Sequence, residues 1–354
     1  MINDLCFEII QACPNNCLFC SSCASINKEK MIELELFKKT INHLIKIGGI
    51  KEISISGGEP FLHPDLFEMI KYCKEKGIKV ILFTSGIKRK KKITSLEFDN
   101  MVNEIIKKYK QYIKQGMEER EYQKYIKIEI DQLIYFYNQE FCEISRSEME
   151  YLKYIGLDKI VFDFQASEES SYNYVMHTKN MLTSLISSMV KATAVKLETD
   201  VHFIPMKCNY KSFLDIIECL NIAEINNLSV LNFVPQGRGA DNVKDLMLTS
   251  EEMEEYKDIY NEGLKLFNGK IRIGIPLIGS DTHLCTAGLE KLVIKYDGTV
   301  LPCPAFKEYN LEQLNALGIE TPNIYTELEK VFVKTGSRAK PLCKELYRFS
   351  DSIK

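Results

Sequence analysis

The chain has 354 residues, 45% of them apolar, and a formal net charge of -3. This length and composition indicate an ordinary globular protein with one sizeable domain and a smaller one. The slightly negative charge excludes a general attraction to nucleic acid or to an anionic membrane surface.

Strand and helix patterns alternate from the start of the chain. A strand over 5–10 precedes a helix over 34–47, and a strand over 53–56 precedes a helix that Pro64 can start and Gly77 can end. A third strand over 78–83 is apolar except for Lys79, as in a parallel sheet. These three strands predict the first half of a strand–helix barrel.

About sixty residues, roughly 87–145, interrupt the alternation. They are rich in Lys, Glu, Tyr and Ile with almost no Gly or Pro, which predicts an inserted helical pair. The alternation resumes at Ser145, which with Glu148 fits a capping box. Further strands are expected over 160–164, 195–204 and 228–234, with helices over 168–192 and 213–223. Six strand–helix units favour an open (βα)6 partial TIM barrel over residues 1–240.

A smaller C-terminal extension is expected over residues 241–354. It begins with a helix near 250–267 and a strand over 271–275. A hairpin follows, with strands over 291–296 and 299–301 on either side of Asp297-Gly298, a strong turn signal.

Twelve cysteines are unusual as idle thiols in a cytoplasmic protein, where clustered cysteines more often ligate metal. We expect that compartment because no leader or membrane-spanning run is visible. Cys13, Cys17 and Cys20 follow the first strand at a spacing that lets three sulfurs converge on one cluster. Three ligands for a [4Fe–4S] cube leave one iron open. The alternative is structural zinc, with Cys23 as the fourth ligand.

A second motif, Gly57-Gly58-Glu59-Pro60, ends the second strand, where ligands bind at the carboxyl edge of a parallel sheet. The glycines let the backbone pass close to a ligand, Glu59 offers a carboxylate to an ammonium group, and Pro60 stiffens the exit. Taken alone, this motif indicates a tight turn.

Together with Thr84-Ser85-Gly86 at the end of the third strand, these motifs resemble those of the radical S-adenosylmethionine (SAM) superfamily. The resemblance covers residues 1–235 and implies that SAM chelates the open iron. It also implies that Phe19 packs beside the adenine, that Glu59 and nearby backbone bind the SAM amino group, and that Ser85 lies near the SAM carboxylate. An electron donor such as flavodoxin or ferredoxin is implied as a partner.

Three residues at the tips of later strands are further candidates for the SAM site. Gln165 and Ser167 follow the fourth strand and could reach the ribose hydroxyls, and Arg238 lies in a turn after the sixth strand, facing SAM or an anionic substrate group. The alternative for Arg238 is a solvated side chain in a glycine loop. His202, within the fifth strand, is more often a core or edge residue than a ligand.

The second cysteine group is Cys285, Cys303 and Cys343. The pattern of Cys285, Gly298 and Cys303 resembles that of the auxiliary-cluster extension called SPASM, or its shortened form, twitch. The full SPASM pattern continues with four further cysteines, and here only Cys343 is present. One auxiliary [4Fe–4S] cluster is therefore expected, with an open iron or with Asp281 or His283 as its fourth ligand. The alternative is a set of buried thiols around a hairpin.

The resulting functional hypothesis is hydrogen abstraction by a 5'-deoxyadenosyl radical, followed by a net oxidation. The SPASM and twitch resemblance suggests a ribosomally made peptide as substrate, and a small nucleotide-like metabolite is the alternative. A non-catalytic, zinc-binding regulatory protein is the alternative of another class, but zinc would not need Glu59. The lysine run 88–92 could serve an acidic peptide or a phosphate, although most such runs are solvated loops.

Overall fold

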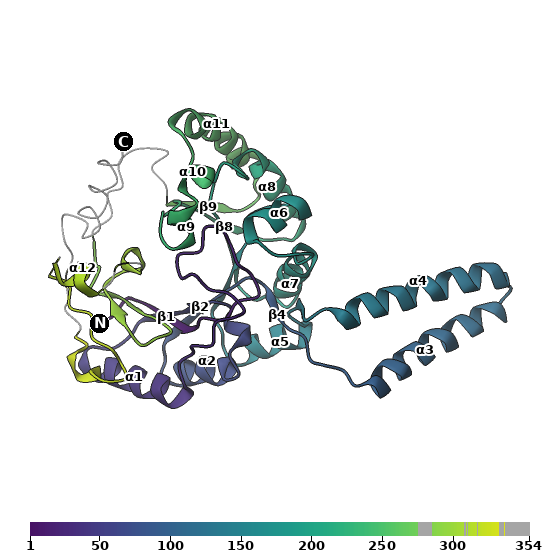
Figure 1. The fold of residues 1–354 in the computed structure, drawn as a ribbon, viewed down its shortest axis with the longest axis horizontal. Helices are drawn as coiled ribbons and strands as arrows, with labels where there is room; N and C mark the ends of the chain where they lie inside the picture. The colour runs from purple at the N-terminus through teal and green to yellow at the C-terminus, as the bar shows by residue number, and fades with distance from the viewer. Residues whose placement is uncertain (275–284, 308, 310, 317, 333–335, 337–354) are drawn as a thin grey trace. The chain divides into compact units, whose positions relative to one another are not determined.

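The computed structural model describes residues 1–274, 285–307, 309, 311–316, 318–332 and 336. Its central feature is a sheet at the middle of the larger unit (Figure 1). This sheet has nine strands in the order β11-β10-β1-β2-β3-β6-β7-β8-β9. All neighbouring strands are parallel except β10 and β11. The strands are β1 (Asp4–Ile10), β2 (Glu52–Gly57), β3 (Lys79–Thr84), β6 (Lys159–Asp163), β7 (Thr199–Phe203), β8 (Asn227–Leu231), β9 (Lys270–Gly274), β10 (Lys291–Ile294) and β11 (Val300–Leu301). This arrangement confirms the expected α/β class with a mostly parallel sheet.

Helices alternate with the strands and surround them (Figure 1). They are α1 (Leu34–Ile47), α2 (Leu66–Glu75), α5 (Arg146–Tyr154), α6 (Glu169–Met176), α7 (Leu182–Ala194), α8 (Phe213–Ile222), α9 (Arg238–Asp241), α10 (Val243–Leu246), α11 (Ser250–Leu266) and α12 (Leu311–Ala316). Short 3-10 turns cover Pro60–Leu62, Tyr210–Ser212, Pro304–Phe306 and Leu328–Lys330. The face of α1 that meets the core carries Phe37, Ile41 and Leu44, spaced as a helix requires. The expected capping box of Ser145 and Glu148 starts α5.

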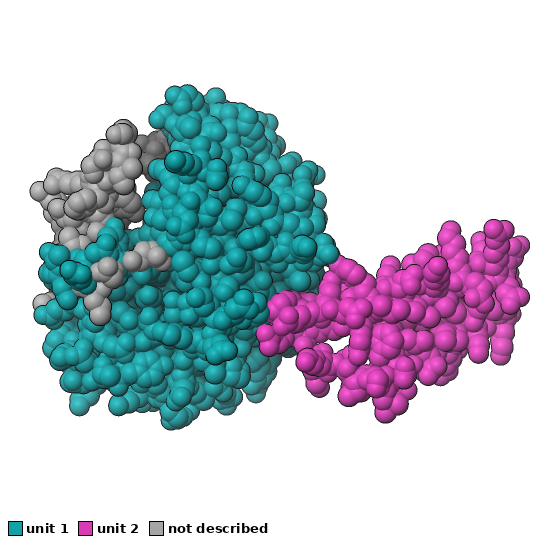
Figure 2. Space-filling model, viewed as in Figure 1, with its two compact units in different colours: residues 1–88, 143–354 teal, residues 89–142 magenta. Residues whose placement is uncertain are grey.

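The insertion forms a separate compact unit over residues 89–142 (Figure 2). It contains the expected helical pair, α3 (Ser95–Ile113) and α4 (Glu119–Asn138). Within this unit the carboxylate of Glu129 on α4 accepts hydrogen bonds from Lys108 and Tyr109 on α3. The short strands β4 (Ile87–Arg89) and β5 (Phe141–Glu143) pair where the chain enters and leaves the insertion.

Two features differ from the sequence-based expectation. The single helix expected over 168–192 is broken between α6 and α7, where His177 and Asn180 have φ angles of 47° and 56°. The strands β9 and β10, which we assigned to a C-terminal extension, join the two ends of the barrel sheet beside β8 and β1. The described residues after 240 therefore belong to the same compact unit as residues 1–88.

None of the helices within the described ranges combines the length and the apolar character needed to cross a lipid bilayer.

Candidate functional site

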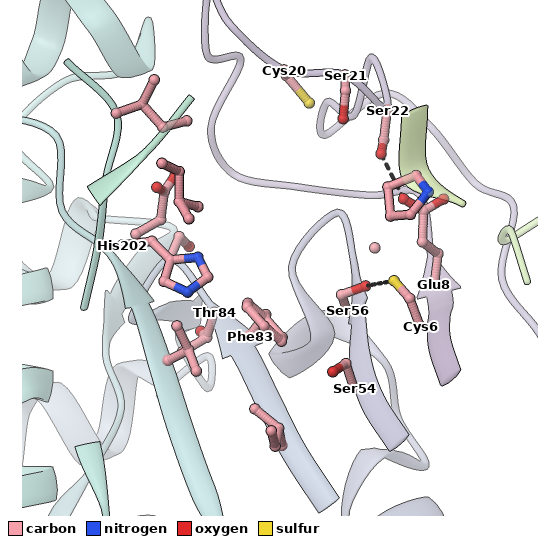
Figure 3. Close-up of a pocket in the computed structure, with 18 of the residues that line it drawn as sticks. Cys6, Glu8, Cys20, Ser21, Ser22, Ser54, Ser56, Phe83, Thr84 and His202 are labelled. Atoms are coloured by element: carbon pink, nitrogen blue, oxygen red, sulfur yellow. Dashed lines mark hydrogen bonds between the residues drawn. The ribbon is translucent and has the colours of Figure 1, made fainter. Parts of the chain in front are cut away.

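A cavity of about 820 Å³ opens on the inner side of the sheet and receives the cysteine loop. Cys13, Cys17 and Cys20 all line it, together with Phe19, Gly57 and Gly58. Figure 3 shows Cys6 and Glu8 of β1 on one side of this cavity and His202 of β7 on the other, with Cys20, Ser21 and Ser22 in the loop beyond. The structure thus brings the two motifs after β1 and β2 to one space.

The three thiols lie within electrostatic range of one another. Burial first, and then the charges of Cys13 and Cys20, raise the pKa of Cys17 well above its usual value. Burial also raises the pKa of Cys13, with Glu59 and Cys20 adding to the shift. Cys13 and Cys17 would stay neutral without added positive charge, and a metal centre supplies that charge because a coordinating thiol is deprotonated outright.

The donor set therefore suits a cluster bound by Cys13, Cys17 and Cys20. The part of the chain that the structure describes contains no three His, Cys, Asp or Glu side chains grouped around a single ion. Cys23, the fourth ligand of the zinc alternative, follows Cys20 in the same loop and has a φ of 47°.

The glycines of the second motif are explained by a close approach of backbone to backbone. A Cβ on Gly57 would lie 2.3 Å from the carbonyl oxygen of Ile10, and one on Gly58 would lie 2.0 Å from that of Ala12. Without side chains, Gly58 N–H donates to Ile10 at 2.6 Å and Glu59 N–H donates to Ala12 at 2.8 Å. The glycines thus fasten this motif to the start of the cysteine loop, while both also line the cavity.

Glu59 lies beneath the cavity wall and is fully buried. Its carboxylate accepts four hydrogen bonds, from Phe61 N–H, Thr84 Oγ1, Ser85 N–H and Ser85 Oγ. Burial raises its pKa to about 7, although these donors oppose the shift. In this structure Glu59 therefore joins the β2 motif to the tip of β3, and the groups that reach the cavity there are Thr84 and Ser85.

At the tip of β6 the residue that lines the cavity is Asp163. The Gln165 side chain is buried, donates to Asp163 and to the His202 carbonyl, and accepts from the Ile204 N–H at 2.9 Å. Ser167 lines a separate pocket of about 240 Å³. Sequence reasoning missed Asp163 because we expected the strand to end one residue later. An acidic residue closing an apolar strand was the available signal.

Arg238 contacts the cysteine loop. Its guanidinium donates at 2.8 Å to the carbonyl oxygens of both Cys17 and Ala24. Beside it, a Cβ on Gly237 would lie 2.5 Å from the Cys20 carbonyl oxygen, so this turn approaches the loop as closely as backbone allows. These contacts hold the loop against the turn after β8.

The second cysteine group is described only in part. Cys285 is buried, Cys303 follows β11, and Cys343, Asp281 and His283 lie outside the described residues. Burial raises the pKa of Cys303, and the charge of Cys285 contributes, which places these two thiols near each other. Because β10 pairs with β1 and β11 pairs with β10, this segment adjoins the strand that leads into the cysteine loop.

A buried ion pair connects the same segment to the cavity. Lys307 Nζ lies 2.5 Å from Glu8 Oε1, and their side chains are 10% and 1% exposed. Ser22 of the cysteine loop donates to the same oxygen at 2.6 Å. Lys307, four residues after Cys303, therefore meets β1 and the cysteine loop at one point, which sequence spacing could not reveal.

Comparisons with known proteins show which family the N-terminal part of the chain is similar to. Residues 7–97 match the sequence model of the family described as Radical SAM superfamily. Residues 7–97 therefore match a radical SAM superfamily domain, and this superfamily implies a [4Fe–4S] cluster and SAM.

Individual relatives are more distant. The PqqA peptide cyclase of Bradyrhizobium diazoefficiens is 21% identical over 306 residues, which cover 84% of this chain and 65% of the cyclase. The probable GTP 3',8-cyclase of Methanococcus maripaludis is 23% identical over 361 residues, covering 95% of each protein. Streptococcus suis SuiB bound to precursor peptide SuiA superposes with a TM-score of 0.62 at 15% identity, covering 93% of this chain and 64% of SuiB. The chain thus spans just under two thirds of the peptide cyclase and of SuiB, and the likeness to SuiB shows a shared fold alone.

Proposed function

We propose that the protein is a radical SAM enzyme that abstracts hydrogen from a ribosomally made peptide and modifies it oxidatively. The observation that carries this proposal is the meeting of three cysteine thiols with Gly57, Gly58 and the β3 tip around one cavity, in a chain that matches the superfamily model. The cluster with bound SAM would supply the chemistry: one electron, from a donor such as flavodoxin or ferredoxin, cleaves SAM to methionine and a 5'-deoxyadenosyl radical.

The chain's own residues would bind and orient the reactants. Cys13, Cys17 and Cys20 would hold the cluster, and Phe19, which lines the cavity, would pack beside the adenine. Glu59 would keep the tips of β2 and β3 in register around the SAM amino and carboxylate groups through the hydrogen bonds described above. Asp163 would be the polar group nearest the ribose side, in place of Gln165 and Ser167, and Arg238 would hold the loop.

The charges around the cavity support a substrate of low net charge. Four lining lysines each have a carboxylate partner: Lys79 with Glu52 at 2.9 Å, Lys159 with Glu198 at 2.8 Å, Lys291 with Asp4 at 2.6 Å, and Lys307 with Glu8 at 2.5 Å. A polyphosphate would need cations that are not already neutralised. The names of the peptide cyclase and of SuiB with its precursor peptide point the same way.

A nucleotide-like metabolite is the second candidate. It is favoured by the probable GTP 3',8-cyclase, because this relative matches the chain over nearly its whole length. In either case Cys285 and Cys303, with Cys343, would hold one auxiliary [4Fe–4S] cluster that accepts an electron from the substrate radical or holds the substrate.

Metal content and SAM cleavage test this proposal. Anaerobic reconstitution should give about eight irons per chain, and replacing Cys13, Cys17 and Cys20 by alanine should halve this content and abolish 5'-deoxyadenosine formation. The matched control is Cys219→Ala on α8, which should change neither. Zinc in place of iron after anaerobic purification would contradict the proposal.

The substrate class and the auxiliary site need a second experiment. The holoenzyme is incubated with SAM, reductant and either GTP or peptides encoded beside its gene, and products are identified by mass spectrometry. A peptide product is expected, and a product from GTP alone would favour the second candidate. Replacing Cys285, Cys303 and Cys343 should preserve SAM cleavage but abolish product, with a circular dichroism melt to check folding.

A further inference from the structure

Two buried polar side chains beside the cysteine loop have no hydrogen-bond partner beyond each other. Asn15, between Cys13 and Cys17, is 1% exposed, and its Oδ1 and Nδ2 have no partner apart from Tyr172. Tyr172 on α6 is 0% exposed, and its hydroxyl has no partner apart from Asn15. Burying a polar group without a hydrogen bond costs free energy, so both groups require an explanation.

Helix α6 delivers Tyr172 to the loop. The loop N–H groups of Asn16 and Leu18 donate to the last carbonyls of this helix, Met176 at 3.0 Å and Val175 at 2.9 Å. Tyr172 lies one turn earlier on the same helix. The break of α6 at His177 therefore helps to hold the loop. In a continuous helix over 168–192, the carbonyls of Val175 and Met176 would accept hydrogen bonds within the helix and would not be left for the loop.

The hydroxyl of Tyr172 lies within the electrostatic environment of the thiols. Burial first, then the charges of Cys17, Asp163 and Cys13, raise the pKa of Tyr172 well above its usual value. Asn15 forms a side-chain hydrogen bond with this hydroxyl, which partly opposes the shift, and Asn15 lines the cavity with Cys13 and Cys17. Tyr172 and Asn15 thus lie beside the thiols that would hold the proposed cluster.

We propose that the Tyr172 hydroxyl and the Asn15 carboxamide donate hydrogen bonds to the sulfur atoms of the cluster held by Cys13, Cys17 and Cys20, and thereby raise its reduction potential. This inference rests on the proposed function. Reduction adds negative charge to the cluster, and hydrogen bonds to its sulfurs stabilise that charge. A trapped water would satisfy the same side chains but would leave the potential independent of them.

The test is an EPR-monitored redox titration of the reconstituted holoenzyme without SAM. Tyr172→Phe removes the donor and keeps the ring, and we expect the equilibrium constant for reduction to fall about tenfold, which is about 59 mV for one electron. Asn15→Leu keeps the side-chain size and should lower the potential in the same direction. The matched control is Tyr256→Phe, because Tyr256 is also 0% exposed with an unpartnered hydroxyl but packs on Phe213, away from the loop.

Iron content and a melting curve accompany each titration. If both variants hold iron and their potentials equal that of Tyr256→Phe, the inference is wrong and the proposed function stands. If the unaltered protein binds no iron, the proposed function itself fails. Should Tyr172→Phe not retain iron, Asn15→Leu decides, and an unchanged potential in that variant overturns the inference.

Discussion

The ion pair between Lys307 and Glu8 should contribute more to stability than any surface pair of the chain that the structure describes. Lys307→Met removes the cation that lies 2.5 Å from Glu8 and leaves a carboxylate that is 1% exposed. The remaining donor to Glu8 Oε1 is then Ser22, and Glu8 Oε2 has no partner even in the unaltered protein. Removing one member of a buried pair strands the other charge, which typically costs about 3–5 kcal/mol.

The lower end of this range is expected here. Burial alone would lower the pKa of Lys307, but the neighbouring Glu8, Cys6 and Cys20 together outweigh burial and raise it. In the variant, Ser22 still donates a hydrogen bond to the Glu8 carboxylate, which offsets part of the penalty. About 3 kcal/mol, at roughly 2 °C per kcal/mol for a domain of this size, predicts a melting temperature lowered by about 6 °C.

The assay is a thermal melt followed by circular dichroism, with two comparisons. Lys257→Met breaks an exposed pair with Glu254 and should leave the melting temperature unchanged. Adding Glu8→Gln to Lys307→Met should recover most of the loss, because no charge is then stranded. A Lys307→Met variant that melts with the Lys257→Met control at pH 7 would refute this reasoning.

Two further predictions concern the second motif. The pKa of Glu59 is raised to about 7, so between about pH 4.5 and 7 the folded state binds more protons than the unfolded state, and the free energy of unfolding falls as pH rises. In urea denaturation, Glu59→Gln should lack this pH dependence, which is worth up to about 3 kcal/mol. The same pH dependence in the variant would contradict the assignment to Glu59. Gly58→Ala places a Cβ 2.0 Å from the Ala12 carbonyl oxygen and should abolish cluster retention. In the control Gly274→Ala, the nearest atom to the new Cβ is 3.5 Å away, and the iron content should equal that of the unaltered chain. A Gly58→Ala protein with its full iron content would show that the contact is dispensable.

Local patterns in the sequence were sufficient for the first three strands and their helices. The expected helix over 34–47 coincides with α1, and the Asp297-Gly298 turn joins β10 to β11, with Gly298 at a φ of 83°. Such signals depend on neighbours a few residues apart, which is why they can be read from sequence alone. The class of the fold follows from them.

Other features depend on contacts between distant segments and could not be predicted. The break after α6 has neither glycine nor proline to mark it, and the helix ends where its carbonyls meet the cysteine loop. Arg238 was expected to face SAM or substrate, but its carbonyl partners lie more than two hundred positions away in sequence. Glu59 was expected to offer its carboxylate to a ligand, and no pattern indicated that the β3 tip would donate to it.

The inner face of the sheet gives a physical reason for the polarity of the cavity. Asp4, Cys6 and Glu8 alternate with the buried Leu5 and Phe7 along β1, so the apolar side packs under the helices and the polar side faces inward. The register of the sheet then sets Lys291 beside Asp4 and Lys79 beside Glu52, and both become ion pairs. A barrel whose interior was lined by apolar side chains would need no such ion pairs. Paired charges keep the cavity wettable and close to neutral, and this is the environment that a peptide backbone, more than a polyphosphate, requires.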